Sequence, residues 1–396
     1  MLVIDACGVG ALPDAALYGD EGTNTLLHVA DATGGLELPT LGGLGLGSIL
    51  RIPGVPAAED PAVFGRLYPL GPGKDSISGH WELMGVVLER ALPTYPGGFP
   101  PPVVSRLTQA MGHEVICNRP YNGIAAVEEF GAEHLRSGSL ILYTSQDSVL
   151  QLAAHVDRVP AEELYRACAA ARAAMTGEHA VGRIIARPFS GADGAFRRTE
   201  GRRDFALAPQ GRSYLQELEA VGVEVHGVGK IGDLFAGVAV TRSHPGATNE
   251  RALESVEELF GELERGLVFV NLIETDQLYG HRKDVRGFEQ ALRRIDARLA
   301  GWLGLLRSED LLIVTADHGV DPAHPGTDHT REYAPLLAVS GRMLRRRAQG
   351  GRLQGERHDG PLADVGATVL RWLTGREADG LPGKAFLDEA RRSRTP

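Results

Sequence analysis

The stretches LVFVNLIETD (267–276) and LLIVTADHG (311–319) decide the fold, because each is a short apolar run that ends in acidic or histidine residues. Runs of this length that are rich in Val, Ile and Leu are typical of buried strands. The stretch LILYTSQD (140–147) repeats the pattern. Ligands of open α/β sheets gather at the carboxyl ends of the strands, so the polar residues that follow these runs are candidates for a functional site.

Similar apolar runs alternate with longer helical patterns along the whole chain, which indicates an α/β fold with a largely parallel sheet. We expect strands at residues 2–5, 114–117, 140–145, 223–229, 267–273, 311–317 and 335–340. We expect helices at residues 161–175, 211–220, 248–264, 286–306 and 362–374.

Two turn-rich segments indicate the domain boundaries. The first is the proline-rich stretch YPGGFPPP (95–102), and the second is the basic stretch 187–209, which is rich in glycine. The segment 93–206 has strands and helices of its own. We therefore expect it to form a domain inserted into a larger core, which is made of residues 1–92 and 207–396.

The composition is that of a soluble globular protein, with 396 residues, 43% apolar and 23% charged. A net charge of −10 argues against a nucleic-acid partner, because phosphate backbones need a basic face. No apolar run approaches the ~18 residues of a membrane span, and the N-terminus lacks the features of a signal peptide. The three cysteines form no CxxC pair, which fits a reducing cytoplasm. We expect a cytoplasmic protein without a membrane partner, and the sequence is compatible with a monomer.

Acidic residues and histidines gather in three places that suggest a metal centre. The candidate ligands are Asp5, Asp276, His281, Asp317, His318 and His329. Mixed carboxylate and imidazole ligands suit divalent ions such as Mn²⁺, Zn²⁺ or Mg²⁺, and six ligands are enough for a two-metal site. The alternative is a set of surface loops in which such side chains form turns, and we assign that role to Asp321 and Asp328.

The stretch LGPGKDSISGHWE (70–82) combines glycines with reactive side chains, and we expect it to enter a helix at residues 80–90. Either Ser76 or Ser78 caps this helix, or one of them takes part in chemistry. A capping box needs Glu or Gln three residues after the serine, and neither serine has one. A hydroxyl at a helix N-terminus lies in a natural phosphate site, where Lys74 would offset the phosphate charge.

Five motifs together resemble the phosphopentomutases, two-metal enzymes of the alkaline phosphatase superfamily. The motifs are DACGVGALPDAALYGDEGTNTLLHVA (5–30), GKDSISGHWELMG (73–85), YTSQDSVLQLAAH (143–155), VGRIIARPF (181–189) and TADHGVDPAHPGTDHTREYAPLL (315–337). The resemblance runs from Met1 to about Phe386. It implies an alkaline-phosphatase-like core, with helices on both faces of a mostly parallel sheet, and an inserted α/β cap domain that binds substrate.

The resemblance also implies an activity, which is the interconversion of ribose 1-phosphate and ribose 5-phosphate, and of their 2-deoxy analogues, in nucleoside salvage. Two divalent ions, typically Mn²⁺, would be needed. The resting enzyme would carry a phosphate on Ser76 and would pass it to the sugar. The resulting sugar bisphosphate would then return its other phosphate to the enzyme, and glucose 1,6-bisphosphate would act as the primer.

The motifs carry family roles onto individual residues. One ion would be held by Asp276, His281 and His329, and the other by Asp5, Asp317, His318 and the nucleophile Ser76. The residues implied for substrate binding are Ser145 and Asp147 for the sugar hydroxyls, Arg183 and Arg198 for the distal phosphate, Lys230 from the core, and Lys74.

Several departures from the family pattern leave alternatives open. Ser76 stands where the family usually has threonine, Ala6 replaces a serine after Asp5, and Glu274 replaces an aspartate. The chain begins only four residues before Asp5, so we expect a shortened first strand or a misassigned start. The alternatives are a related mutase for another sugar phosphate, a phosphatase, a phosphodiesterase, a phosphoglycerate mutase, or a non-catalytic binding protein. The presence of all six ligands and a hydroxyl nucleophile opposes the last of these.

Overall fold

The chain forms two compact units, which a computed structural model describes over residues 1–145 and 147–387. Unit 1 consists of Met1–Ala91 and the chain from Pro209 onward, and unit 2 consists of Leu92–Ala208. The sequence analysis expects breaks after residues 92 and 206. The roles of the two units as core and cap stay proposals.

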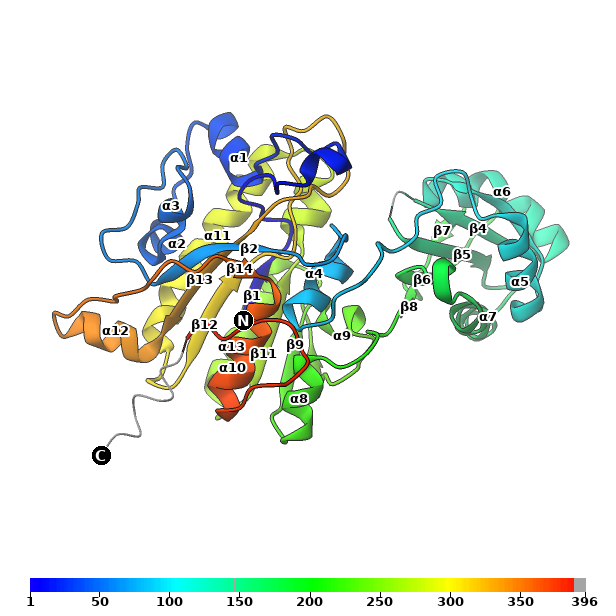
Figure 1. Cartoon of the computed structure of the whole chain (residues 1–396). Coiled ribbons are helices and arrows are strands. Elements are labelled where there is room, and N and C mark those ends of the chain that lie inside the picture. Colours follow the sequence, from blue (N-terminus) through cyan, green and yellow to red (C-terminus); the bar gives the residue numbers. More distant parts are fainter. Residues whose placement is uncertain (146, 388–396) are drawn as a thin grey trace. The chain divides into compact units, whose positions relative to one another are not determined.

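Unit 1 is built on an eight-stranded sheet (Figure 1). In spatial order its strands are β10 (Arg242–His244), β9 (Val225–Val228), β11 (Leu267–Leu272), β1 (Leu2–Ile4), β12 (Leu311–Thr315), β13 (Ala334–Ser340), β2 (Val63–Tyr68) and β14 (Gly360–Pro361). The first five strands are parallel, as expected for this fold class. Strand β13 is antiparallel to both β12 and β2, so β2 again runs in the direction of β12.

The direction of the strands determines which residues share one edge of the sheet. The carboxyl ends of β1, β11, β12 and β2 lie at the same edge, and β13 begins there because it runs the opposite way. The segments that precede β13 and follow the other strands therefore meet at this edge, which we call the carboxyl edge.

Two groups of helices cover the sheet of unit 1 (Figure 1). One group packs around α11 and comprises α1 (Thr25–Thr33), α2 (Pro39–Leu44), α3 (Leu46–Ile49), α10 (Asn249–Glu262) and α11 (Val285–Leu305). The other group comprises α4 (Ser76–Leu83), α8 (Tyr214–Ala220), α9 (Ile231–Leu234) and α13 (Ala363–Thr374). The remaining helical segments are η1 (Ala15–Tyr18), the π-helical turn η3 (Thr275–Gly280) and α12 (Gly341–Ala348).

The longest helix, α11, shows why these segments are helical. Its buried residues Phe288, Leu292, Ile295 and Leu299 recur at helical spacing and form one apolar stripe. The helix begins after Asp284, whose side chain accepts a hydrogen bond of 2.9 Å from the N–H of Gly287. The period of this stripe is visible in the sequence, and the predicted helix at 286–306 differs from the observed one by one residue at each end.

Unit 2 has a six-stranded mixed sheet with helices on both faces. Its strands are β3 (Val115–Pro120), β4 (Leu140–Thr144), β5 (Val149–His155), β6 (Arg183–Ser190), β7 (Arg197–Arg198) and β8 (Arg203–Ala206). Its helical segments are α5 (Pro101–Met111), α6 (Gly123–Ser137), α7 (Ala161–Ala174) and the single turn η2 (Gly177–His179). Apolar residues of α5 and α7 share one buried cluster with one face of the sheet, and those of α6 share a second cluster with the other face.

In the part of the chain that the structure describes, no helix has both the length and the apolar character needed to cross a bilayer.

The core of unit 1 can be tested at Leu336, which is fully buried in β13. We expect Leu336→Ala to lower the free energy of unfolding by about 2–5 kcal/mol. The change removes buried apolar atoms, whose transfer from water stabilises the fold, and it leaves a cavity. Urea unfolding followed by tryptophan fluorescence reports on unit 1 alone, since Trp81, Trp302 and Trp372 all belong to it. The control Leu17→Ala removes a side chain that is 86% exposed, and equal effects of the two changes would contradict this core.

Candidate metal and phosphate site

The predicted ligands lie at the carboxyl edge of the sheet in unit 1. Asp5 follows β1, Asp276 lies in η3 just after β11, and Asp317 and His318 follow β12. These three strands are neighbours in the order β11, β1, β12, and they run parallel. His329 lies in the loop before β13, which begins at the same edge. The topology therefore gathers residues that are hundreds of positions apart in the sequence.

Asp5, Asp317 and His318 form the first ligand group, and their ligand atoms lie within 4.8 Å of one another. The Nε2 atom of His318 is 3.3 Å from Asp5 Oδ1 and 3.3 Å from Asp317 Oδ2. The second oxygen of each carboxylate is held from behind. Asn271 Nδ2 donates to Asp5 Oδ2 at 2.9 Å, and the N–H of Ala6 donates to Asp317 Oδ1 at 3.2 Å. The remaining oxygens face a common space.

Asp276, His318 and His329 form the second ligand group, again with ligand atoms within 4.8 Å. The Oδ1 atom of Asp276 is 3.5 Å from His329 Nε2 and 3.2 Å from His281 Nε2. The structure thus brings all six predicted ligands together. It also places His318 in both groups, whereas the resemblance assigns it to the first ion only.

The π-helical turn η3 explains how Asp276 and His281 meet. The N–H of His281 donates to the carbonyl of Asp276 at 3.3 Å, a link between residues five apart. Such a turn is rare and is found mostly at functional sites. It places two side chains on one face that an α-helix would separate, so the spacing alone does not reveal their proximity.

Hydrogen bonds fix the orientation of two of the histidines. Nδ1 of His318 is 3.1 Å from the carbonyl of Gly319, and Nδ1 of His281 is 2.6 Å from the carbonyl of Thr327. A carbonyl accepts only, so each Nδ1 carries the proton and each Nε2 presents a lone pair to the carboxylates. Outer contacts of this kind commonly hold histidines as metal ligands.

The side chains present fit divalent metal ions. Asp276 Oδ1 and Asp317 Oδ2 are buried and have no hydrogen-bond donor among the described residues. Buried carboxylate oxygens need a partner, and a cation held by oxygen and imidazole nitrogen would supply it. The donor set contains no thiolate, which fits Mn²⁺, Mg²⁺ or catalytic Zn²⁺ better than a structural zinc.

The electrostatics of the cluster also favour a cation. Burial acts to raise the pKa of Asp5, but the hydrogen bond and the charge of His318 prevail and hold that pKa well below its ordinary value. Burial acts to lower the pKa of His318, but the charge of Asp317 and the contact with Asp5 raise it well above its ordinary value. Both pKa shifts show that the cluster favours positive charge beside Asp5 and Asp317, as expected of a site for cations.

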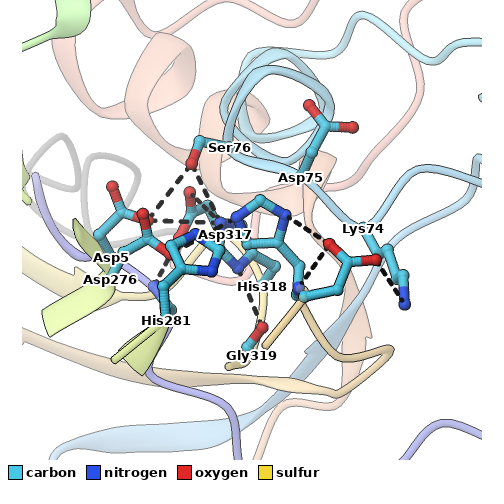
Figure 2. Close-up of polar contacts among 12 residues, drawn as sticks. Asp5, Lys74, Asp75, Ser76, Asp276, His281, Asp317, His318 and Gly319 are labelled. Atoms are coloured by element: carbon cyan, nitrogen blue, oxygen red, sulfur yellow. Dashed lines mark hydrogen bonds and ion pairs between the residues drawn. The ribbon is translucent and has the colours of Figure 1, made fainter. Parts of the chain in front are cut away.

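Ser76 is the first residue of α4 and points into this cluster (Figure 2). Its Oγ atom is 3.1 Å from His318 Nε2 and 3.5 Å from Asp5 Oδ1. Its position at the beginning of the helix adds the positive end of the helix dipole. The hydroxyl thus lies between a set of carboxylates and histidines and the N-terminus of a helix.

Two details of the prediction for this helix were wrong. The helix spans Ser76–Leu83 and not 80–90, because Asp75 caps it and accepts hydrogen bonds from the N–H groups of Ile77 and Ser78 at 3.0 and 3.1 Å. Ser78 also takes part in capping, although the sequence analysis found no capping box for it. It is the third residue of a capping box, and its Oγ donates to Asp75 Oδ2 at 2.9 Å. An acidic cap replaced the serine cap that the sequence analysis considered.

The loop before α4 is held from two sides. Glu82 reaches back from α4 and accepts hydrogen bonds from the N–H groups of Leu70 and Gly71 at 2.6 and 2.9 Å. The buried guanidinium of Arg331 donates to the carbonyl of Gly73 at 2.6 Å. Arg331 precedes β13, so the loop of the candidate nucleophile is joined to the segment that carries His329.

The two predicted phosphate-binding lysines differ in their contacts. Lys74 Nζ donates to Asp20 at 3.0 Å and is 3.5 Å from Asp328 (its position is labelled in Figure 2). Lys230 directly precedes α9, and its charge helps to lower the pKa of Asp5. Asp321, which we expected to form a turn, accepts the N–H of Ala323 at 2.9 Å, but it also contacts His28 Nδ1 at 2.6 Å.

The remaining predicted substrate residues lie in unit 2. The N–H of Asp147 donates to Ser145 Oγ at 3.3 Å, just after β4. Arg183 begins β6, and its Nε is buried without a hydrogen-bond partner among the described residues. Arg198 donates to the hydroxyl of Tyr143 at 3.4 Å. Ser145, Asp147 and Arg183 thus lie at the carboxyl end of β4 and the start of β6, whereas Arg198 lies in β7, which pairs with the other end of β6.

Sequence reasoning missed the second arginine of β6. Arg187 is spaced by four residues from Arg183, so both side chains lie on one face of β6. Its Nε donates to Gln151 Oε1 at 3.2 Å. Burial and the charge of Arg202 lower the pKa of Arg187 to about 10. The period-two pattern within VGRIIARPF is a signal that could have identified it.

Comparisons with known proteins agree with this geometry. Residues 1–375 match the family description "Metalloenzyme superfamily". The chain is 45% identical over 390 residues to phosphopentomutase of Dictyoglomus turgidum, covering 98% of this chain and 97% of that protein. It is 45% identical over 393 residues to phosphopentomutase of Carboxydothermus hydrogenoformans, covering 99% of each. It is 46% identical over 375 residues to phosphopentomutase of Levilactobacillus brevis, covering 93% of each.

Metal binding can be tested with two histidines of one loop. We expect about two Mn²⁺ ions per chain after loading, and we expect His329→Ala to lose one of them, because His329 belongs to the second ligand group. The matched control is His324→Ala, since the ring of His324 contacts the carbonyl of Gly19 at 2.9 Å and lies outside both groups. Elemental analysis after gel filtration gives the stoichiometry. One ion in the unchanged protein, or equal loss in both variants, would contradict the assignment.

Proposed function

The chain belongs to the phosphopentomutase family, and we propose that it interconverts ribose 1-phosphate and ribose 5-phosphate, together with their 2-deoxy analogues. The observation that carries this proposal is the position of Ser76. Its Oγ lies at the beginning of α4, 3.1 Å from His318 and 3.5 Å from Asp5, inside a cluster of acids and histidines. Full-length similarity to curated phosphopentomutases supports the choice of substrate.

We propose that the resting enzyme carries a phosphate on Ser76 Oγ. In the first step the Oγ–P bond breaks, a P–O bond to a sugar hydroxyl forms, and the proton of that hydroxyl ends on Ser76 Oγ. The product is a sugar bisphosphate. In the second step Ser76 Oγ takes the phosphate from the other position, and the proton returns to the sugar oxygen. A bisphosphate such as glucose 1,6-bisphosphate would restore the phosphate when it is lost.

Two divalent ions, most reasonably Mn²⁺, would neutralise the charge of the transferring phosphoryl group. The first would be held by Asp5, Asp317 and His318, and the second by Asp276, His281 and His329. The protein's own contribution is orientation. Asn271 and Ala6 fix the carboxylates of Asp5 and Asp317, and the cap at Asp75 fixes the direction of the helix that carries Ser76.

We assign substrate-binding roles residue by residue, as the family motifs imply. Arg183 and Arg198 would bind the distal phosphate, because guanidinium groups match phosphate geometry. Ser145 and Asp147 would bind the sugar hydroxyls. Lys230 would balance phosphate charge near Asp5, whose pKa it already influences. Lys74 is the weaker candidate, since Asp20 and Asp328 contact its ammonium group.

We also propose that the protein acts in the cytoplasm. Its three cysteines are free thiols, which suits a reducing compartment.

The activity can be tested by a coupled assay of ribose 1-phosphate conversion with Mn²⁺ and glucose 1,6-bisphosphate. We expect ribose 5-phosphate to form with little release of inorganic phosphate, because the phosphoryl group stays on the enzyme between the two steps. Release of phosphate in proportion to substrate consumed would instead identify a phosphatase. Conversion of another sugar phosphate in preference to the pentose would overturn the substrate assignment.

The two serines of the α4 entry provide a matched test of the nucleophile. We expect Ser76→Ala to abolish turnover and phosphate incorporation from labelled bisphosphate, while the fold is retained. Ser78→Ala should lose about 1 kcal/mol of stability through the capping box but should still become phosphorylated. Mass spectrometry of the labelled peptide locates the phosphate. Incorporation in the Ser76 variant would show that another residue is the nucleophile.

A further inference from the structure

Four consecutive residues of α4, Gly79 to Glu82, contact other segments of unit 1. A side chain at Gly79 would place its Cβ 2.4 Å from the carbonyl oxygen of Asp317, so only glycine lets α4 lie this close to the metal-ligand segment. Trp81 Nε1 donates to the carbonyl of Leu234 at 2.8 Å. Glu82 holds the preceding loop, as described above. The proposed reaction assigns no function to the fourth residue, His80.

His80 lies between the candidate nucleophile and a candidate metal ligand. Its side chain is fully buried, and Nδ1 is 2.8 Å from the carbonyl oxygen of Ser76 and 3.1 Å from Asp317 Oδ2. The N–H donates to the carbonyl, while Asp317 Oδ2 makes an electrostatic contact with the ring and accepts no hydrogen bond from it. The ring stacks on Phe269 of β11, with centroids 5.8 Å apart. One N–H group therefore contacts both partners from a fixed position.

The carboxylate of Asp317 depends on this contact. Its Oδ1 is occupied by the N–H of Ala6, and its Oδ2 is the oxygen that lies 3.3 Å from His318 Nε2 in the first ligand group. Apart from His318, His80 is the only described residue that forms an ion pair with this oxygen. Metal-binding carboxylates are usually held by outer donors, and loss of such a donor weakens metal binding.

We propose that His80 is a positioning residue that fixes the metal-facing oxygen of Asp317 relative to the backbone of Ser76. This inference rests on the proposed metal site and nucleophile. His80 does not touch substrate. It sets the distance between the residue that carries the phosphate and the ion that would neutralise it, so that a shift of α4 and a shift of Asp317 are coupled.

Two substitutions separate the donor from the ring. His80→Phe keeps a flat ring to stack on Phe269 but removes the N–H. His80→Asn removes the ring but retains an N–H donor near the position of Nδ1. A packing role predicts that phenylalanine is tolerated better, whereas a positioning role predicts that asparagine is. Trp81→Phe is the matched control on the same helix, because it removes one hydrogen bond that points to α9 and not to the ligands.

The experiment measures Mn²⁺ affinity of the metal-depleted full-length protein, by the electron paramagnetic resonance signal of free Mn²⁺, together with thermal midpoints, kcat and KM. We expect His80→Phe to bind Mn²⁺ about 10–100-fold more weakly and to lose kcat with little change in the KM for pentose phosphate. We expect His80→Asn to recover most of both quantities. Trp81→Phe should lower the thermal midpoint without changing Mn²⁺ affinity.

Wild-type Mn²⁺ affinity in His80→Phe would overturn the proposal, and so would an asparagine variant that is no better than the phenylalanine variant. A reduction of affinity by Trp81→Phe of the same size would show that any damage to α4 has this effect, which also overturns it. Failure of the unchanged protein to bind Mn²⁺ would overturn the two-metal function itself. These results are distinguishable because the affinity measurement does not require turnover.

Discussion

The mutual repulsion of three buried carboxylates is the constraint on which the rest of the site depends. Asp5, Asp276 and Asp317 are all buried at one edge of the sheet, and such charges are costly unless cations or donors accompany them. Neighbouring side chains compensate the negative charge of these carboxylates. His318 belongs to both ligand groups, and Asn271 donates a hydrogen bond to Asp5. The same negative charge makes the edge suitable for divalent ions. A site that binds cations strongly is in turn able to hold phosphate between them.

The topology of the sheet explains how the candidate ligands and Ser76 come together. Strands β1, β11 and β12 deliver acids at their ends, and a single reversed strand, β13, delivers His329 at its beginning. A second reversal returns β2 to the original direction, so the loop that leads to Ser76 emerges at the same edge. Without the two reversals, the candidate nucleophile and the last histidine would lie at opposite edges. Arg331 then ties these two segments together through the carbonyl of Gly73.

The parts of this arrangement that depend on local patterns could be predicted from the sequence. Apolar runs that end in acids located Asp5, Asp276 and Asp317, and helical spacing located α11 within one residue at each end. The parts that depend on long-range contacts could not. The contact of His80 with Asp317 is set by packing and is not visible in GKDSISGHWE. The cap at Asp75 is local and was missed because only the two serines were tested as caps. The π-helical turn that joins Asp276 to His281 could not be predicted from the spacing of these residues either. Strands β2, β5 and β6 were also missed.

The ligands of the site are contributed by both ends of the sequence, and this has a consequence for the order of events during synthesis. Asp5 is synthesised well before its partners Asp317, His318 and His329, which follow it by more than half of the chain. Unit 2, by contrast, is built from one continuous stretch of chain, so all of its internal contacts are available early. The cation site can therefore assemble only after nearly the whole chain has been made. Ions that need both groups of ligands could therefore bind only after His329 has been synthesised.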